Sequence, residues 1–171
     1  FGAGNSVLFK NQVGGLVLAD QATALTITPT TVNTNGQITT NGGGFVNQGT
    51  LRATGAGGLV LSGGQFNNNG GTIEALAGST VWLQGGTTIS GGTLGRASGG
   101  EVRTTSGHFA NLDGVSQGTL TIAGNYVAGN ASTTNLSGAI ANTAVVDPDN
   151  TIAETLTRLP GGPPATLLQQ V

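Results

Sequence analysis

The feature that most constrains this chain is a repeat with a period of 21 or 22 residues between positions 45 and 94. Three landmarks keep this period: a Gly-Thr-Leu or Gly-Thr-Ile step, an apolar triplet, and a Gly-Gly step. They occur at Gly49–Leu51, Gly71–Ile73 and Gly92–Leu94, at Leu59–Leu61 and Val81–Leu83, and at Gly63–Gly64 and Gly85–Gly86. Such periods are typical of stacked supersecondary units, which bury a common core only when several are joined.

Within each repeat, apolar residues lie two positions apart, which is the period of a strand with one buried face. No helical spacing of three or four is sustained across this region. We therefore expect three short strands per repeat, separated by Gly-Gly, Asn-Gly and Ser-Gly steps that supply positive φ at corners. The expected inward residues are Leu51, Ala53, Ile73, Ala75 and Leu94 in the first strand, Leu59, Leu61, Val81, Leu83, Val102 and Thr104 in the second, and Phe45, Phe66, Ile89 and Phe109 in the third.

This pattern predicts an all-β fold, a parallel β-solenoid (β-helix) of about five or six rungs of about 21–22 residues each. The alternative is an antiparallel sandwich, whose turns need not keep one period. We expect a cap or docking segment at 1–6, the solenoid at 7–146, and a non-solenoid cap, linker or docking tail at 147–171. Within the tail, 151–158 is a candidate for one or two helical turns, and 165–171 is a candidate for a short strand.

Outside the clearest repeats, the pattern weakens and leads to specific expectations. The pentapeptide Gly14–Leu18 is identical to Gly57–Leu61, which predicts the same place in the rung. Residues 30–44 are expected to form a weaker rung, and 111–117 an insertion that moves the Gly-Thr-Leu step 26 residues on. Counting along the strand turns Arg96 inward, where an unpaired charge is unfavourable. We therefore expect a one-residue bulge there.

Two contacts between neighbouring rungs are expected on the outer surface. Arg52 and Glu74 each follow the apolar residue of the first strand, so they face solvent on adjacent rungs. An ion pair between them would contribute a few tenths of a kcal/mol. Trp82 and Arg103 occupy the equivalent outward place on the second strand, which predicts a cation–π contact.

Charge and hydropathy exclude two classes of partner. Only 7% of the 171 residues are charged, and the five basic residues provide no electrostatic footprint for nucleic acid. No apolar run approaches the roughly 20 residues of a spanning helix, so no membrane span is expected. The chain begins at Phe1 without a leader, so we expect a processed form or an excerpt of a longer protein.

The residues that carry chemistry are sparse. The chain has no Cys and a single His, His108, so we expect no metal site and no cofactor. The segment Asp147–Asn150 is more typical of a turn than of a Ca²⁺ loop. No acid pair or nucleophile with a base can be assembled from the spacing, so we expect no catalytic residue and no enzyme.

The segment Gly118–Tyr126, together with the earlier Gly-Thr-Leu and Gly-Thr-Ile steps, resembles a phrase common in bacterial secreted β-solenoid proteins. These are the repeat-rich passenger regions of autotransporters and large surface adhesins. The resemblance covers about residues 36–146. It implies export, a location on the bacterial cell surface or outside the cell, and a role in binding or scaffolding. It carries over no functional residue.

We expect an extracellular structural protein, a subunit of a surface filament or layer that assembles with itself head to tail by rung-end stacking or strand exchange. The alternative is a rod-like segment of a large bacterial adhesin or autotransporter passenger that binds glycan or a neighbouring surface. A segment of a phage fibre, in which solenoids trimerise, is a third possibility. The residues expected to take part in interactions are Phe1, Trp82, Arg103, Leu167, Leu168 and Val171.

Overall fold

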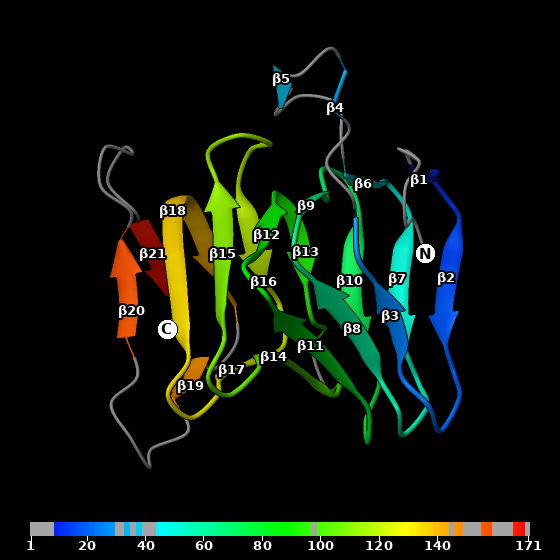
Figure 1. Cartoon of the computed structure of the whole chain (residues 1–171). Coiled ribbons are helices and arrows are strands. Elements are labelled where there is room, and N and C mark those ends of the chain that lie inside the picture. The colour runs from blue at the N-terminus through cyan, green and yellow to red at the C-terminus, as the bar shows by residue number, and fades with distance from the viewer. Residues whose placement is uncertain are drawn as a thin grey trace.

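The computed structural model describes residues 9–29, 33–34, 37–38, 44–96, 99–143, 146–148, 155–158 and 166–169. The regular elements in these residues are all strands, and all but two of them wind into a parallel β-solenoid (Figure 1), which confirms the predicted fold. The strands are β1 (Phe9–Asn11), β2 (Leu16–Ala19), β3 (Leu25–Ile27), β4 (Asn33–Thr34), β5 (Gln37–Ile38), β6 (Phe45–Asn47), β7 (Thr50–Ala53), β8 (Leu59–Ser62), β9 (Gln65–Asn67), β10 (Thr72–Ala75), β11 (Thr80–Gln84), β12 (Thr87–Ser90), β13 (Gly92–Leu94), β14 (Glu101–Thr104), β15 (Phe109–Gly114), β16 (Leu120–Ile122), β17 (Asn125–Ala128), β18 (Thr133–Asn142), β19 (Val146–Pro148), β20 (Thr155–Arg158) and β21 (Thr166–Gln169).

Three parallel sheets run along the solenoid. Sheet A contains β1, β6, β9, β12, β15 and β18, sheet B contains β2, β7, β10, β13, β16 and β18, and sheet C contains β3, β8, β11, β14, β17 and β19. The ten-residue strand β18 spans a corner, so its first half pairs in sheet A and its second half in sheet B. The four turns from β6 to β17 follow one another without interruption and form the regular body.

The register of the body confirms most of the predicted inward positions. Ile73 pairs with Leu51 in sheet B, and Val81 pairs with Leu59 in sheet C. All four side chains are 0% exposed. Burial of each such aliphatic side chain contributes about 1.5–3 kcal/mol, so the column of stacked apolar residues holds the turns together.

Phe109 was expected to face inward, and the structure shows this expectation to be wrong. Ile89 of β12 pairs with Leu112 of β15, and Leu112 is 0% exposed. Phe109 lies three residues earlier in the same strand and is 51% exposed. Since successive strand residues alternate between faces, an offset of three places the Phe109 ring on the outer face.

The identical pentapeptides do not occupy the same place in the rung. Val17 pairs with Leu51 in sheet B, whereas Leu59–Leu61 lies in sheet C and pairs with Leu25–Ile27. Leu16 and Leu18 are exposed, at 52% and 41%, although the matching Leu59 and Leu61 are fully buried. A shift of one residue moves every side chain to the opposite face, and the neighbouring strand decides between the two registers.

The expected weaker rung at 30–44 is also wrong. β4 and β5 pair with each other in an antiparallel two-stranded sheet separate from the solenoid. β1 pairs directly with β6, with Phe9 opposite Phe45. In Figure 1, β4 and β5 lie at the top of the view, outside the stacked strands. The segment after β3 is therefore an insertion between two adjacent turns.

The insertion expected at 111–117 lies a few residues later in the chain. β15 continues to Gly114, and β16 begins at Leu120, so the extra residues form the connection 115–119. Gly92 pairs with Leu120 and Leu94 with Ile122. The sequence-based alignment of Leu120 with Leu94 was therefore wrong by two residues, which leaves the inward face unchanged.

Arg96 does not point into the core. β13 ends at Leu94, and Gly95 has a φ of +75°, a conformation that turns the chain away before Arg96. The Arg96 side chain is 48% exposed. The bulge proposed to place Ala97 inward falls outside the described residues.

The tail contains two strands that pair with the solenoid. β20 pairs with the first half of β18 and β21 with its second half, both in parallel. Residues 155–158 are therefore extended, and the expected helical turn is wrong there. The strand expected within 165–171 is present as β21.

Candidate functional site

An asparagine ladder runs along the corner between sheets A and B. Asn11 Nδ2 donates to Asn47 Oδ1, and Asn47 Nδ2 donates to Asn68 Oδ1, both at 2.7 Å. Asn68 Nδ2 donates to the carbonyl oxygens of Gly91 and Thr93, both at 3.3 Å. All three asparagines are buried. Because an unpaired buried amide is costly, the ladder favours this one register of the turns.

An aromatic stack runs beside the ladder. The ring centroids of Phe9 and Phe45 are 4.7 Å apart with an interplanar angle of 23°, and those of Phe45 and Phe66 are 5.6 Å apart. Ile89 and then Leu112 continue the column. Each phenylalanine precedes a ladder asparagine by two residues, a spacing that the sequence shows but that our sequence analysis missed.

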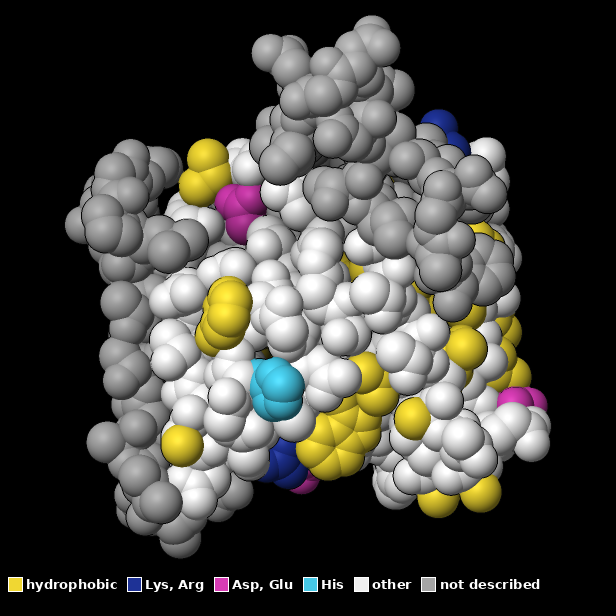
Figure 2. All heavy atoms as spheres, viewed as in Figure 1, with side chains coloured by type: hydrophobic (Ala, Val, Ile, Leu, Met, Phe, Trp, Pro, Cys, Tyr) yellow, Lys and Arg dark blue, Asp and Glu magenta, His cyan; other side chains and the backbone are white. Residues whose placement is uncertain are grey.

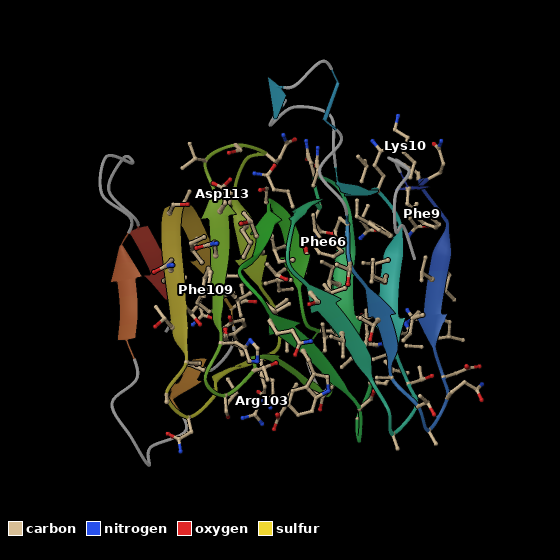
Figure 3. The ribbon with its side chains drawn as sticks, in the orientation of Figure 1. Phe9, Lys10, Phe66, Arg103, Phe109 and Asp113 are labelled. Carbon is tan, nitrogen blue, oxygen red and sulfur yellow. The ribbon has the colours of Figure 1, made fainter. Side chains whose placement is uncertain are left out.

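The N-terminal end of the solenoid exposes apolar side chains. β1, β2 and β3 each have one neighbour in the sheets, so each leaves one edge unpaired among the described strands. Of the seven large hydrophobic residues that are exposed in the described part of the chain, five lie in this first turn. We call this set the N-terminal end: Phe9, Val13, Leu16, Leu18 and Leu25. Figure 3 shows Phe9 and Lys10 at that extreme of the molecule.

The outer surface of sheet C carries the predicted cation–π contact. The Arg103 guanidinium carbon lies 5.3 Å from the centroid of the Trp82 ring, which confirms that prediction. Arg103 Nη1 also lies 3.3 Å from Glu101 Oε2. Strand pairing of Trp82 with Arg103 places the two side chains on adjacent turns. The result is a half-buried group that combines an aromatic ring, a guanidinium and a carboxylate.

The outer surface of sheet B carries a small charge network. Arg52 Nε and Glu74 Oε1 are 2.6 Å apart, which confirms the predicted pair. Arg96 Nε lies 3.8 Å from the other carboxylate oxygen of Glu74, so one acid contacts two bases across three turns. Glu74 is only 5% exposed. The two partly exposed arginines compensate the charge of this buried carboxylate.

A buried hydroxyl network lies at the C-terminal side of the body. The Tyr126 hydroxyl oxygen is 2.6 Å from Thr104 Oγ1 and 3.2 Å from Thr134 Oγ1, and the two threonine oxygens are 2.7 Å apart. Burial raises the pKa of Tyr126, although the hydrogen bonds from Thr104 and Thr134 act in the opposite direction. The phenol therefore serves the packing of the core.

Asp113 organises the connection between β15 and β16. Its Oδ1 accepts hydrogen bonds from the Val115 and Ser116 backbone amides at 2.7 and 3.2 Å, and its Oδ2 accepts one from Ser90 Oγ. Burial alone would raise the pKa of Asp113, but hydrogen bonds from Ser116 and Val115 hold it below its usual value. The carboxylate is thus committed to holding a turn.

The expected interaction residues are distributed over the molecule. Trp82 and Arg103 contact each other on sheet C. Leu167 and Leu168 lie in β21, opposite Ile140 and Ala141 of β18. Phe1 and Val171 fall outside the described residues.

The surface chemistry is neutral over the face shown in Figure 2, where charged side chains are few. His108 is exposed, and its Nδ1 accepts a hydrogen bond from the Gly85 amide at 3.3 Å. No group of three or more His, Cys, Asp or Glu residues that could hold a metal ion occurs in the described part of the chain. Across the same residues, no helix has the length and apolar character needed to cross a membrane.

Comparison with known proteins adds no assignment. No protein-family model, no curated protein and no solved structure matched the chain.

Proposed function

We propose that this chain is an extracellular structural protein, a subunit of a surface filament or layer whose copies associate through the ends of the solenoid. The N-terminal end carries the proposal, because it combines strand edges that are unpaired among the described strands with Phe9, Leu16 and Leu25, which are 39%, 52% and 37% exposed. Unpaired edges readily accept strands of another chain. An end contact between unlike surfaces builds a filament when its rotation does not close into a ring.

Two further observations support end-to-end association. At the other end of the molecule, β20 and β21 each pair only with β18 among the described strands, so the sheets also end there. The formal net charge is only −2 over 171 residues. A net charge near zero offers little electrostatic repulsion between copies.

Sedimentation velocity and negative-stain electron microscopy over a range of protein concentrations test the proposal. We expect elongated assemblies that grow with concentration. Leu16→Lys places a charge at the N-terminal end and should reduce assembly. Val115→Lys is its matched control, because Val115 is similarly exposed (48% against 52%) but lies in the connection after β15. Monodisperse monomers at every concentration would contradict the proposal, as would equal effects of the two substitutions.

The Trp82–Arg103 contact favours a second candidate, a rod-like adhesin segment that binds glycan. An aromatic ring can stack on a sugar, and the Arg103 and Glu101 side chains beside Trp82 offer hydrogen-bonding groups. A glycan array tests this candidate. Signals that disappear in Trp82→Ala but persist in Val60→Ala, which alters the outward neighbour one turn earlier, would support it. An array without signal for the unaltered chain would count against it.

A further inference from the structure

The ladder and the aromatic stack arise from one repeated motif, Phe-x-Asn. It occurs in sheet A at Phe9–Asn11, Phe45–Asn47 and Phe66–Asn68. The ladder has a direction, because Asn11 and Asn47 each donate through Nδ2 to the asparagine of the following turn, and Asn68 donates onward to backbone carbonyl oxygens. Each of the later two turns therefore receives one amide hydrogen bond and one ring from the turn before it.

In the ladder, the first turn donates to the second, and no described residue donates to the Asn11 side chain of the first. Asn11 Nδ2 is used by Asn47 Oδ1, with the carbonyl oxygens of Gly15 and Thr50 at 3.3 and 3.2 Å. Asn11 Oδ1 accepts no hydrogen bond from any described residue. This side chain is 6% exposed and already fixed in the ladder conformation, so its acceptor is preorganised.

Asn68 shows that such an acceptor can receive a donor. A Cβ added to Gly71 would lie 2.7 Å from Asn68 Oδ1, so the oxygen lies close to the glycine of its own turn. Asn68 Oδ1 nevertheless accepts from Asn47 at 2.7 Å. Asn11 Oδ1 lies against Gly15 in the same way. The open acceptor of the first turn therefore has the same local setting as a filled one.

The aromatic stack is open at the same place. Phe45 is 4% exposed and Phe66 is 0% exposed, whereas Phe9 is 39% exposed. Phe9 already contacts Phe45 on one side. Part of its ring is therefore uncovered, on the terminal strand that also carries Asn11.

We propose that the N-terminal end binds an extended strand of another chain that carries Phe-x-Asn, parallel to β1 and in the register of the ladder. The phenylalanine of the strand stacks on Phe9, and the Nδ2 of its asparagine donates to Asn11 Oδ1. This mode is strand addition to a sheet edge. It rests on the proposed function, because it specifies what the assembling end recognises.

The sequence shows which mode of assembly this recognition selects. Phe-x-Asn occurs a fourth time at Phe109–Asn111, but there Phe109 is 51% exposed and Asn111 bonds Thr88 on the outer face. The motif does not occur after residue 111. Stacking of an intact C-terminal end would therefore not continue the Phe-x-Asn repeat of the ladder. Exchange of a Phe-x-Asn strand fills both the acceptor and the stack.

A labelled synthetic peptide with the sequence of residues 44–50, Gly-Phe-Val-Asn-Gln-Gly-Thr, tests the proposal by fluorescence anisotropy against the full chain. We expect saturable binding. Peptides with Asn47→Ala or Asn47→Asp should bind at least about fivefold more weakly, because a hydrogen bond of about 1 kcal/mol is lost. A peptide of reversed sequence should not bind.

Two variants of the full chain test where the peptide binds. Phe9→Ala should weaken binding at least about tenfold, as expected for the loss of a stacked ring. Phe109→Ala removes an exposed ring from another strand and should leave binding unchanged, and circular dichroism checks that both variants fold. Equal binding of the Asn47→Ala or reversed peptide would overturn the proposal, as would no binding at millimolar peptide. Filaments that form without any peptide binding would contradict this proposal but not the proposed function. Peptide binding by a chain that stays monomeric would contradict only the proposed function.

Discussion

At the scale of single residues, the asparagine ladder is where we expect a substitution to be most costly. Asn47 is the middle member, and its replacement leaves Asn11 Nδ2 and Asn68 Oδ1 without their ladder partners. Each buried group left unpaired costs about 1–3 kcal/mol. We expect Asn47→Ala to lower the free energy of unfolding by about 2–4 kcal/mol in urea titrations. Gln48→Ala, at the exposed neighbouring position, should change it by less than about 0.5 kcal/mol.

A second prediction concerns pH and Tyr126, the only tyrosine of the chain. Burial raises the pKa of Tyr126 in the folded state, so as pH rises the unfolded chain loses this proton first, near pH 10. Ionisation therefore favours unfolding. We expect stability to be fully retained below about pH 10 and to fall as pH rises towards the folded pKa. This decline should be absent in Tyr126→Phe. Phenolate absorbance that appears before loss of the β-sheet signal would contradict the prediction.

Residue positions were predictable where two features agreed. Leu51, Ile73 and Leu94 are flanked by the same Gly-Thr step in each turn, and all three are fully buried as expected. Phe109 was misplaced because hydrophobicity alone does not show where a strand begins. The ladder was visible as Phe-x-Asn, but asparagine at corners was interpreted only as a turn former. Its role depends on stacking with other turns, which a local pattern does not reveal.

At the scale of elements, the segment between β3 and β6 interrupts the solenoid, and we expect the solenoid to fold without it. A Cβ at Gly64 would lie 2.8 Å from Pro29 O, and one at Gly44 would lie 2.5 Å from Gln65 O. The two ends of the segment therefore lie against consecutive residues of one turn. Replacing residues 30–43 by Gly-Gly, the connection used between β8 and β9, should preserve the circular dichroism spectrum.

The same replacement should not lower stability. Each halving of loop length reduces the closure cost by about 0.6 kcal/mol, so a gain of about 1 kcal/mol is expected. Thermal denaturation measures it, with a Gly-Ser linker of the original length as the control. A shortened chain that unfolds at much lower temperature would show that the segment supports the first turn.

The two-residue period predicted that these segments are strands. It did not predict which sheet each strand joins or which of its faces is buried. The identical sequences Gly14–Leu18 and Gly57–Leu61 lie in different sheets and show opposite faces. A short strand can satisfy either register, and the turn beneath it makes the choice. For the same reason, the spacing of residues 30–44 suggested a rung. In the structure β1 pairs directly with β6, which leaves no place for a rung between them.

At the scale of the whole molecule, the solenoid is a one-dimensional stack in which each turn contacts its neighbours. Removing residues 1–43 should therefore leave a folded solenoid that begins at β6. Its new end would resemble the old one, because Phe45 and Asn47 then occupy the terminal places of the stack and the ladder. Residues 44–171 should unfold cooperatively at a lower temperature than the full chain. A peptide of residues 9–15 should bind this shortened chain and raise its melting temperature. The same peptide with Asn11→Ala should bind at least about fivefold more weakly.

An unfolded product would show that the first turn is part of the minimal domain. A folded product that does not bind the peptide would show that end recognition is not a property of the ladder.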